Sequence, residues 1–133
     1  MTTRILAPLF LLLALGFGSG CHTTVKQYRK EMSVYRHVVA FKFKDSATPQ
    51  QIDEIVTEFG KLPSKIDTII GYEWGPQVSP EPLHEGTTHV FLVTFKDRAG
   101  LDVYLPHPAH KEFVAKLKPI MEKAVVVDYH ARD

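Results

Sequence analysis

The sequence predicts an α+β fold in which four strands and two main helices follow one another in the order βαββαβ. Four segments alternate apolar and polar residues at the two-residue period of a strand, and two longer segments repeat apolar residues at the period of a helix. Residues 34–133, which carry these patterns, form a stretch of about 100 residues. That length suits a single domain with one hydrophobic core.

The first strand and the first helix are predicted within residues 37–62. The strand, residues 37–44, is rich in β-forming side chains, and one of its faces holds His37, Val39, Phe41 and Phe43. Thr48-Pro49-Gln50-Gln51 is a capping box with proline at the first helical position, so a helix is predicted to begin there. Its inward residues recur at helical spacing: Ile52, Ile55, Val56, Phe59 and Leu62. Pro63 is predicted to end it.

Two middle strands are predicted on either side of a long loop. Ile70, Tyr72 and Trp74 alternate in the second strand, and residues 88–96 form the third. One face of the third strand is predicted to hold His89, Phe91, Val93 and Phe95. The loop over residues 75–86 contains three prolines, and its length fits either a functional flap or a spacer.

The last part of the domain is predicted to contain a short helix, a longer helix and a strand. Asp97 caps the short helix, whose apolar residues are Leu101, Tyr104 and Leu105. The longer helix starts at Pro108 with His107 as its cap, because proline is tolerated in a first helical turn. Its inward residues are Phe113, Leu117, Ile120 and Met121. Pro119 is expected to kink or end this helix, and residues 125–129 form the last strand.

This order of elements predicts a ferredoxin-like fold, which is an antiparallel four-stranded sheet with helices on one face. The first and last strands carry apolar residues on both faces, as Val38 and Ala40 show in the first and Val125 and Val127 in the last. The face without helices would expose this apolar surface on a monomer. The sequence therefore predicts a homodimer.

Residues 1–20 are predicted to be a signal peptide that precedes the domain. Arg4 gives a positive start, residues 5–17 are almost wholly apolar, and small residues follow at 18–20. The apolar run is shorter than the roughly 20 residues that span a bilayer. An exported protein in the cell envelope is therefore expected.

Cys21, the only cysteine, directly follows these small residues. This arrangement resembles the signal sequence of bacterial lipoproteins, in which a cysteine at this position is acylated. Gly18 stands where that pattern usually has leucine, so ordinary cleavage nearby is the alternative to lipidation. Residues 21–33 have no apolar period and are predicted to be a flexible tether, anchored to the membrane if Cys21 is acylated.

The charge of the chain argues against nucleic acid as a partner. Without Arg4 the chain has 15 basic and 15 acidic residues, and no basic run is present. Metal binding by His37, His89 and His110 is also disfavoured, because the domain contains no cysteine. His107 and His110 are three positions apart, but Pro108 lies between them. No cofactor is expected.

The segment Tyr104–His110 holds the candidate chemistry, a phenol and two imidazoles within seven residues that also contain Pro106 and Pro108. One interpretation makes His110 a general base on an acidic C–H and Tyr104 a hydrogen-bond donor to the developing oxyanion. The other makes both residues structural, with Tyr104 packed on the sheet and His110 holding the helix start. Residues that could line a pocket for a small apolar molecule are His37, His89, Phe59, Phe91 and Trp74.

Several short motifs together resemble a known family. They are His37, Phe41-Lys42-Phe43-Lys44, Glu85-Gly86, Thr88-His89 and Tyr104…His107-Pro108-Ala109-His110…Phe113. The chain is similar in this way to the stress-responsive α/β-barrel (Dabb) domain from Val34 to Arg132. The resemblance implies ferredoxin-like chains that dimerise sheet to sheet into a dimeric α/β barrel.

The resemblance also implies roles for individual residues. In a plant polyketide cyclase of this family, a histidine and a tyrosine catalyse an intramolecular aldol closure, and they match His110 and Tyr104. Histidines lining the pocket of that enzyme match His37 and His89, whereas one of its pocket tyrosines falls on Phe59. The main functional hypothesis is a binding protein for a small apolar molecule. An enzyme (cyclase, isomerase or lyase) and a purely structural dimer are the alternatives.

Overall fold

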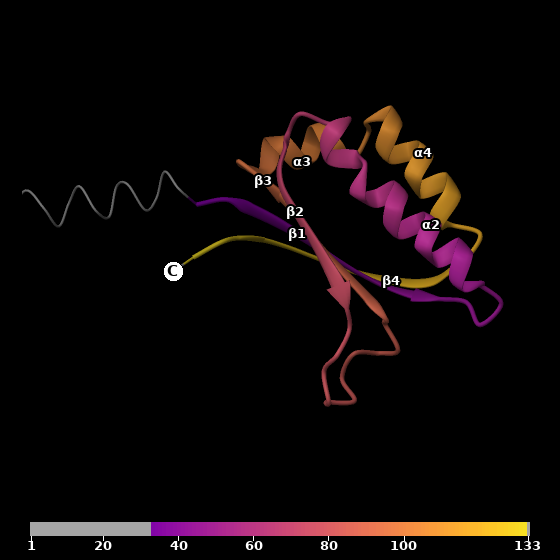
Figure 1. Cartoon of the computed structure of the whole chain (residues 1–133). Helices are drawn as coiled ribbons and strands as arrows, with labels where there is room; N and C mark the ends of the chain where they lie inside the picture. The colour runs from indigo at the N-terminus through magenta and orange to yellow at the C-terminus, as the bar shows by residue number, and fades with distance from the viewer. Residues whose placement is uncertain (1–32, 133) are drawn as a thin grey trace, which may run out of the picture. The chain divides into compact units, whose positions relative to one another are not determined.

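The computed structural model describes residues 33–132 of the chain, and Figure 1 shows their arrangement. The predicted signal peptide (1–20), Cys21 and nearly all of the predicted tether (21–33) lie outside the described residues. Within residues 33–132, no helix is long and apolar enough to cross a membrane.

One antiparallel sheet of four strands forms the base of the domain, in the order β2-β3-β1-β4. Its strands are β1 (Tyr35–Phe43), β2 (Ile69–Pro76), β3 (His89–Phe95) and β4 (Met121–His130). The first and last strands of the chain are therefore neighbours, with His37 opposite Asp128.

Three α-helices lie together on one side of this sheet (Figure 1). They are α2 (Pro49–Gly60), α3 (Arg98–Tyr104) and α4 (Pro108–Leu117), and a 3-10 turn, η1 (Leu62–Ser64), follows α2. The predicted ferredoxin-like α+β fold is confirmed, including the short helix α3. The β2–β3 loop projects away from the layers (Figure 1).

The predicted helix starts are also confirmed. The Thr48 hydroxyl accepts a hydrogen bond from the Gln51 backbone N–H, and the Gln51 side chain accepts one from the Thr48 N–H. At α4, the ring of His107 accepts a hydrogen bond from the Ala109 N–H at 3.2 Å. These local contacts satisfy N–H groups that have no partner within the helix.

The sequence prediction was wrong at two places. Ile120 and Met121 do not belong to α4, because the helix ends at Leu117, ahead of Pro119, and Met121 begins β4. The alternation predicted over Ile70, Tyr72 and Trp74 also fails at Ile70. A bulge between Ile69 and Gly71 puts Ile69 in the core and leaves Ile70 58% exposed.

Aromatic rings dominate the core between the sheet and the helices. Phe59 of α2 is 1% exposed and lies at the centre, with its ring centroid 4.6 Å from those of Phe91 and Phe113. Phe41 and Tyr72 surround it at 6.2 and 5.4 Å. This ring cluster connects α2 and α4 to the sheet, as offset and tilted aromatic contacts typically do.

The sheet face away from the helices is apolar at its centre. Cross-strand pairing places two rows of residues on it, Val127-Val38-Leu92 and Val125-Ala40-Val90. Charged and polar side chains, such as Arg36 and Lys42, lie beyond these rows on the same face. The two-sided apolar pattern predicted from the sequence is present in the strands.

Candidate functional site

A cleft of about 340 Å³ lies between α4 and the helix-facing side of β1 and β4. Its lining is mainly apolar, with four polar exceptions: His37, Tyr104, His110 and Asp128. A small pocket with an apolar lining and a few convergent polar groups is the usual form of a ligand site. This cleft therefore contains the candidate site.

His37 and Asp128 form a hydrogen-bonded pair at the sheet side of the cleft. Nδ1 of His37 donates to Oδ1 of Asp128 at 2.6 Å, and the histidine is only 6% exposed. The antiparallel pairing of β1 with β4 places the two residues directly opposite each other. A carboxylate partner fixes the orientation and tautomer of an imidazole, so this ring is held in one position.

Tyr104 lies between the two histidines of the cleft. Its ring centroid is 5.8 Å from that of His37 and 4.2 Å from that of His110. The phenol is 1% exposed, and this burial raises the pKa of Tyr104 far above its usual value. Tyr104 therefore keeps its proton at any physiological pH and remains a hydrogen-bond donor.

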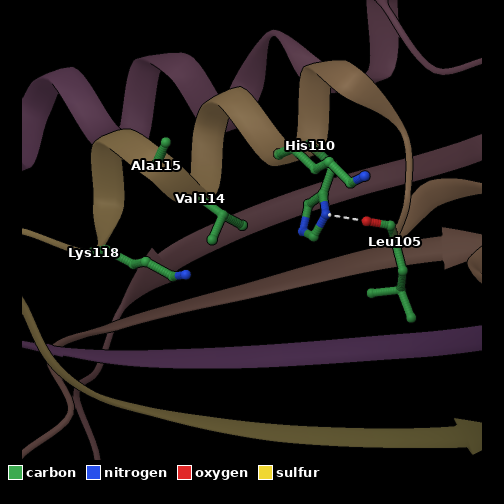
Figure 2. Close-up of a pocket in the computed structure, with 6 residues that line it drawn as sticks. Leu105, His110, Val114, Ala115 and Lys118 are labelled. Atoms are coloured by element: carbon green, nitrogen blue, oxygen red, sulfur yellow. Dashed lines mark hydrogen bonds between the residues drawn. The ribbon is translucent and has the colours of Figure 1, made fainter.

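His110 is held at the start of α4 by one specific hydrogen bond, which Figure 2 shows. Its Nδ1 donates to the backbone oxygen of Leu105 at 3.0 Å. Because a carbonyl oxygen can only accept, the proton is on Nδ1, and Nε2 of the neutral ring carries a free lone pair. The ring thus presents a base on the atom that the backbone does not use.

Burial is the main reason that the pKa of His110 lies below its usual value. The hydrogen bond to Leu105 opposes this shift, whereas the nearby rings of His37 and His107 add to it. A lowered pKa keeps the imidazole neutral at physiological pH, which is the form that a general base requires.

The remaining predicted site residues divide into two groups. Phe59 lines the cleft, but Phe91, which is fully buried, contacts Phe59 from the core. His89 and Trp74 lie outside the cleft and stack on each other, with ring centroids 6.1 Å apart. Burial lowers the pKa of His89 as well. The structure therefore brings together His37, Tyr104, His110 and Phe59, and not His89 or Trp74.

The Tyr72 hydroxyl is buried without a hydrogen-bond partner among the described residues. Burial raises the pKa of Tyr72 to about 12, so the group is a protonated donor.

No arrangement of three or more histidine, cysteine, aspartate or glutamate side chains in the described part of the chain could hold a metal ion.

Asp128 is the site residue that sequence reasoning missed. Its signal was available, since it is a single acid directly after Val125-Val126-Val127 in a strand. Alternation places it on the same face as Val126, which also lines the cleft. The identity of its partner could not be read from the sequence, because it depends on the register between two strands that are far apart in the chain.

A second, more open depression lies beside the cleft and shares Leu105, His110 and Val114 with it. Two lysines, Lys111 and Lys118, line this depression. Figure 2 shows Lys118 lying beneath α4, on the same side of the helix as Val114 and the His110 ring. His110 therefore lies where the buried cleft meets the surface.

Comparison with known proteins gives related sequences of similar length. An Arabidopsis thaliana stress-response A/B barrel domain-containing protein is 36% identical over 94 residues, which cover 71% of this chain and 86% of the relative. Olivetolic acid cyclase from Cannabis sativa is 32% identical over 97 residues, covering 73% and 96%.

Solved structures show the same fold. Hydroxynitrile lyase from Passiflora edulis superimposes with a TM-score of 0.71 at 28% identity, covering 77% of this chain and 96% of the lyase. Three structures at 23–24% identity, which share the fold alone, are of dimeric proteins. The Stress responsive A/B Barrel Domain (Dabb) matches residues 35–131. The chain therefore belongs to the stress-responsive A/B barrel (Dabb) family.

Proposed function

We propose that the domain is an acid–base enzyme acting on a small, largely apolar carbonyl compound bound in the cleft. Nε2 of His110 takes a proton from the carbon next to the carbonyl group. The electron pair of that C–H bond moves into the enolate, whose oxygen accepts a hydrogen bond from the Tyr104 hydroxyl. Return of the proton from His110 to the rearranged product completes the cycle.

The hydrogen bond between His110 and Leu105 is the observation that carries this proposal. It assigns the ring proton to Nδ1 and leaves Nε2 as a base. The ring centroid of His110 is 4.2 Å from that of Tyr104, whose phenol is protonated. A structural histidine inside a closed core would not need a cleft beside it, and this one lines a cleft. Two relatives, a cyclase and a lyase, are enzymes by name.

A binding protein without chemistry is the second candidate. The apolar lining of the cleft favours it, because Phe41, Phe113, Leu117 and Val126 offer surface for an alkyl or aromatic group. Both candidates place the small molecule in the same cleft, so they differ only in whether a proton moves.

Proton exchange on a simple ketone tests the proposal. In D2O, the chain is expected to accelerate the loss of the α-proton signals of 2-octanone, followed by ¹H NMR. An Ala124→Trp variant is the matched control, because Ala124 is exposed and lines the cleft, so the larger ring should block the cleft without disturbing the core. Binding of 2-octanone without any acceleration would support the second candidate, and no binding would contradict both.

We further propose that the chain is a homodimer joined through the apolar sheet face. Val126 and Val127 offer a matched test, since both are 52% exposed but belong to opposite faces of β4. Val127→Glu, on the face without helices, is expected to give monomers in sedimentation velocity, whereas Val126→Glu is expected to leave the dimer intact. A monomeric parent chain at micromolar concentration would rule the dimer out.

We also propose that the enzyme works in the cell envelope, anchored through an acylated Cys21. The predicted signal peptide supports this location. The Cys21→Ser variant is expected to move from the membrane fraction to the soluble fraction of an expressing bacterium. An unchanged distribution between the two fractions would count against the anchor.

A further inference from the structure

The two sides of the cleft carry charges of opposite sign, and this difference suggests a class of ligand. Asp128 brings a carboxylate to the sheet side of the cleft, where it is already hydrogen-bonded to His37. Lys111 and Lys118 belong to the helix side, in the depression that shares His110 with the cleft. Among residues 33–132, the lysines that line the cleft or this depression are therefore both on the side of α4.

These two lysines differ from the other lysine near the end of α4. Lys116 is held by the carboxylate of Glu58 at 2.8 Å and lies near Glu54 at 3.9 Å, on the α2 side. Within residues 33–132, no carboxylate forms an ion pair with Lys111 or Lys118. Their ammonium groups are thus free to attract an anion from outside the chain.

The position of Lys118 relates this charge to the cleft. Lys111, Val114 and Lys118 recur at spacings of three and four, so they lie along one face of α4 and its C-terminal cap. Val114 lines both hollows, and in Figure 2 the Lys118 side chain runs beneath the helix on the same side as Val114 and His110. The ammonium group is therefore next to the opening of a mainly apolar cleft.

We propose that the cleft takes an amphipathic monocarboxylate, with its apolar body between α4 and the sheet and its carboxylate at Lys118, supported by Lys111. This inference rests on the proposed function, because it requires that the cleft binds a small molecule. The opposite orientation would place the carboxylate against Asp128, where the like charges repel. A neutral ligand of the same shape would lose the attraction of the lysines and keep only the apolar contacts.

Calorimetric titration with octanoate and 1-octanol tests this inference. The two probes share an eight-carbon skeleton and differ in charge. The chain is expected to bind octanoate about fivefold more tightly than 1-octanol, the ratio typical of a partly exposed charge pair, and about 0.5 M salt should reduce the difference. Lys118→Met should reduce the preference, leaving only the contribution of Lys111, without weakening the binding of 1-octanol.

Lys116→Met is the matched control, because Lys116 is also on the exposed surface of α4 but pairs with Glu58 on the other side. It should leave both affinities unchanged. Equal affinities of the parent chain for the two probes would overturn the proposal of a monocarboxylate ligand, and so would an unchanged preference in Lys118→Met. Either result would leave the proposed ligand site in place. If neither probe binds, both this inference and the proposed ligand site are overturned.

Discussion

Replacing His110 by glutamine is expected to slow the ketone exchange reaction by about 10²–10⁴-fold, the usual contribution of a positioned general base. A glutamine amide can still donate a hydrogen bond to the Leu105 oxygen, so the helix start should survive. It cannot accept a proton at neutral pH, which removes the base alone. ¹H NMR exchange rates at saturating 2-octanone measure the loss, and circular dichroism checks that the fold is retained.

The dependence of the same reaction on pH provides an independent check. The reaction needs neutral His110, and burial places the pKa of this ring below the ordinary histidine value. The pH at which the rate falls to half is therefore expected to lie below the ordinary histidine value of about 6.5, because Nε2 becomes protonated at a lower pH than in an unperturbed histidine. A rate that halves above pH 6.5, or His110→Gln with the parent rate, would contradict the assignment of His110.

Replacing Phe59 by alanine is expected to lower the free energy of unfolding by about 3–5 kcal/mol. The ring is 1% exposed and contacts rings from β1, β2, β3 and α4, so its removal leaves a cavity that rigid neighbours cannot close. Urea denaturation followed by far-ultraviolet circular dichroism measures the change.

Trp74→Ala is the matched control for the Phe59 variant. Both substitutions remove an aromatic ring that stacks near Phe91, but Trp74 is 48% exposed and lies on the edge strand β2. Its loss is expected to cost less than half as much, because the ring gives up less buried surface. Equal effects of the two variants would mean that Phe59 is not the centre of the core.

The elements that could be predicted from the sequence are those with local causes. The capping box at Thr48 and the proline after His107 act within a few residues, and both helices begin where these signals are. The end of α4 was harder to place. The apolar spacing continues to Met121, although Pro119 and the pairing of Met121 with Phe43 make that residue part of β4.

Strand registers explain what could not be predicted at the site. Alternation puts His37 and His89 on the same face of the sheet, but it does not say how far along the strands each lies. His89 lies opposite Phe41 at one end of β3. His37 lies opposite Val93 of β3 on one side and opposite Asp128 of β4 on the other. Tyr104 and His110 were proposed to act together because they are only six positions apart, and the structure places their ring centroids 4.2 Å apart.

The hydrogen bond between His37 and Asp128 also bears on how the domain folds. The two residues are 91 positions apart in the chain, and they meet only when the last strand pairs with the first. Closing so long a loop carries a large entropy cost, and contacts of this range slow folding. A partly folded chain in which β4 has not yet paired with β1 therefore lacks the sheet side of the cleft. A ligand that binds in the cleft stabilises only the native state, by mass action.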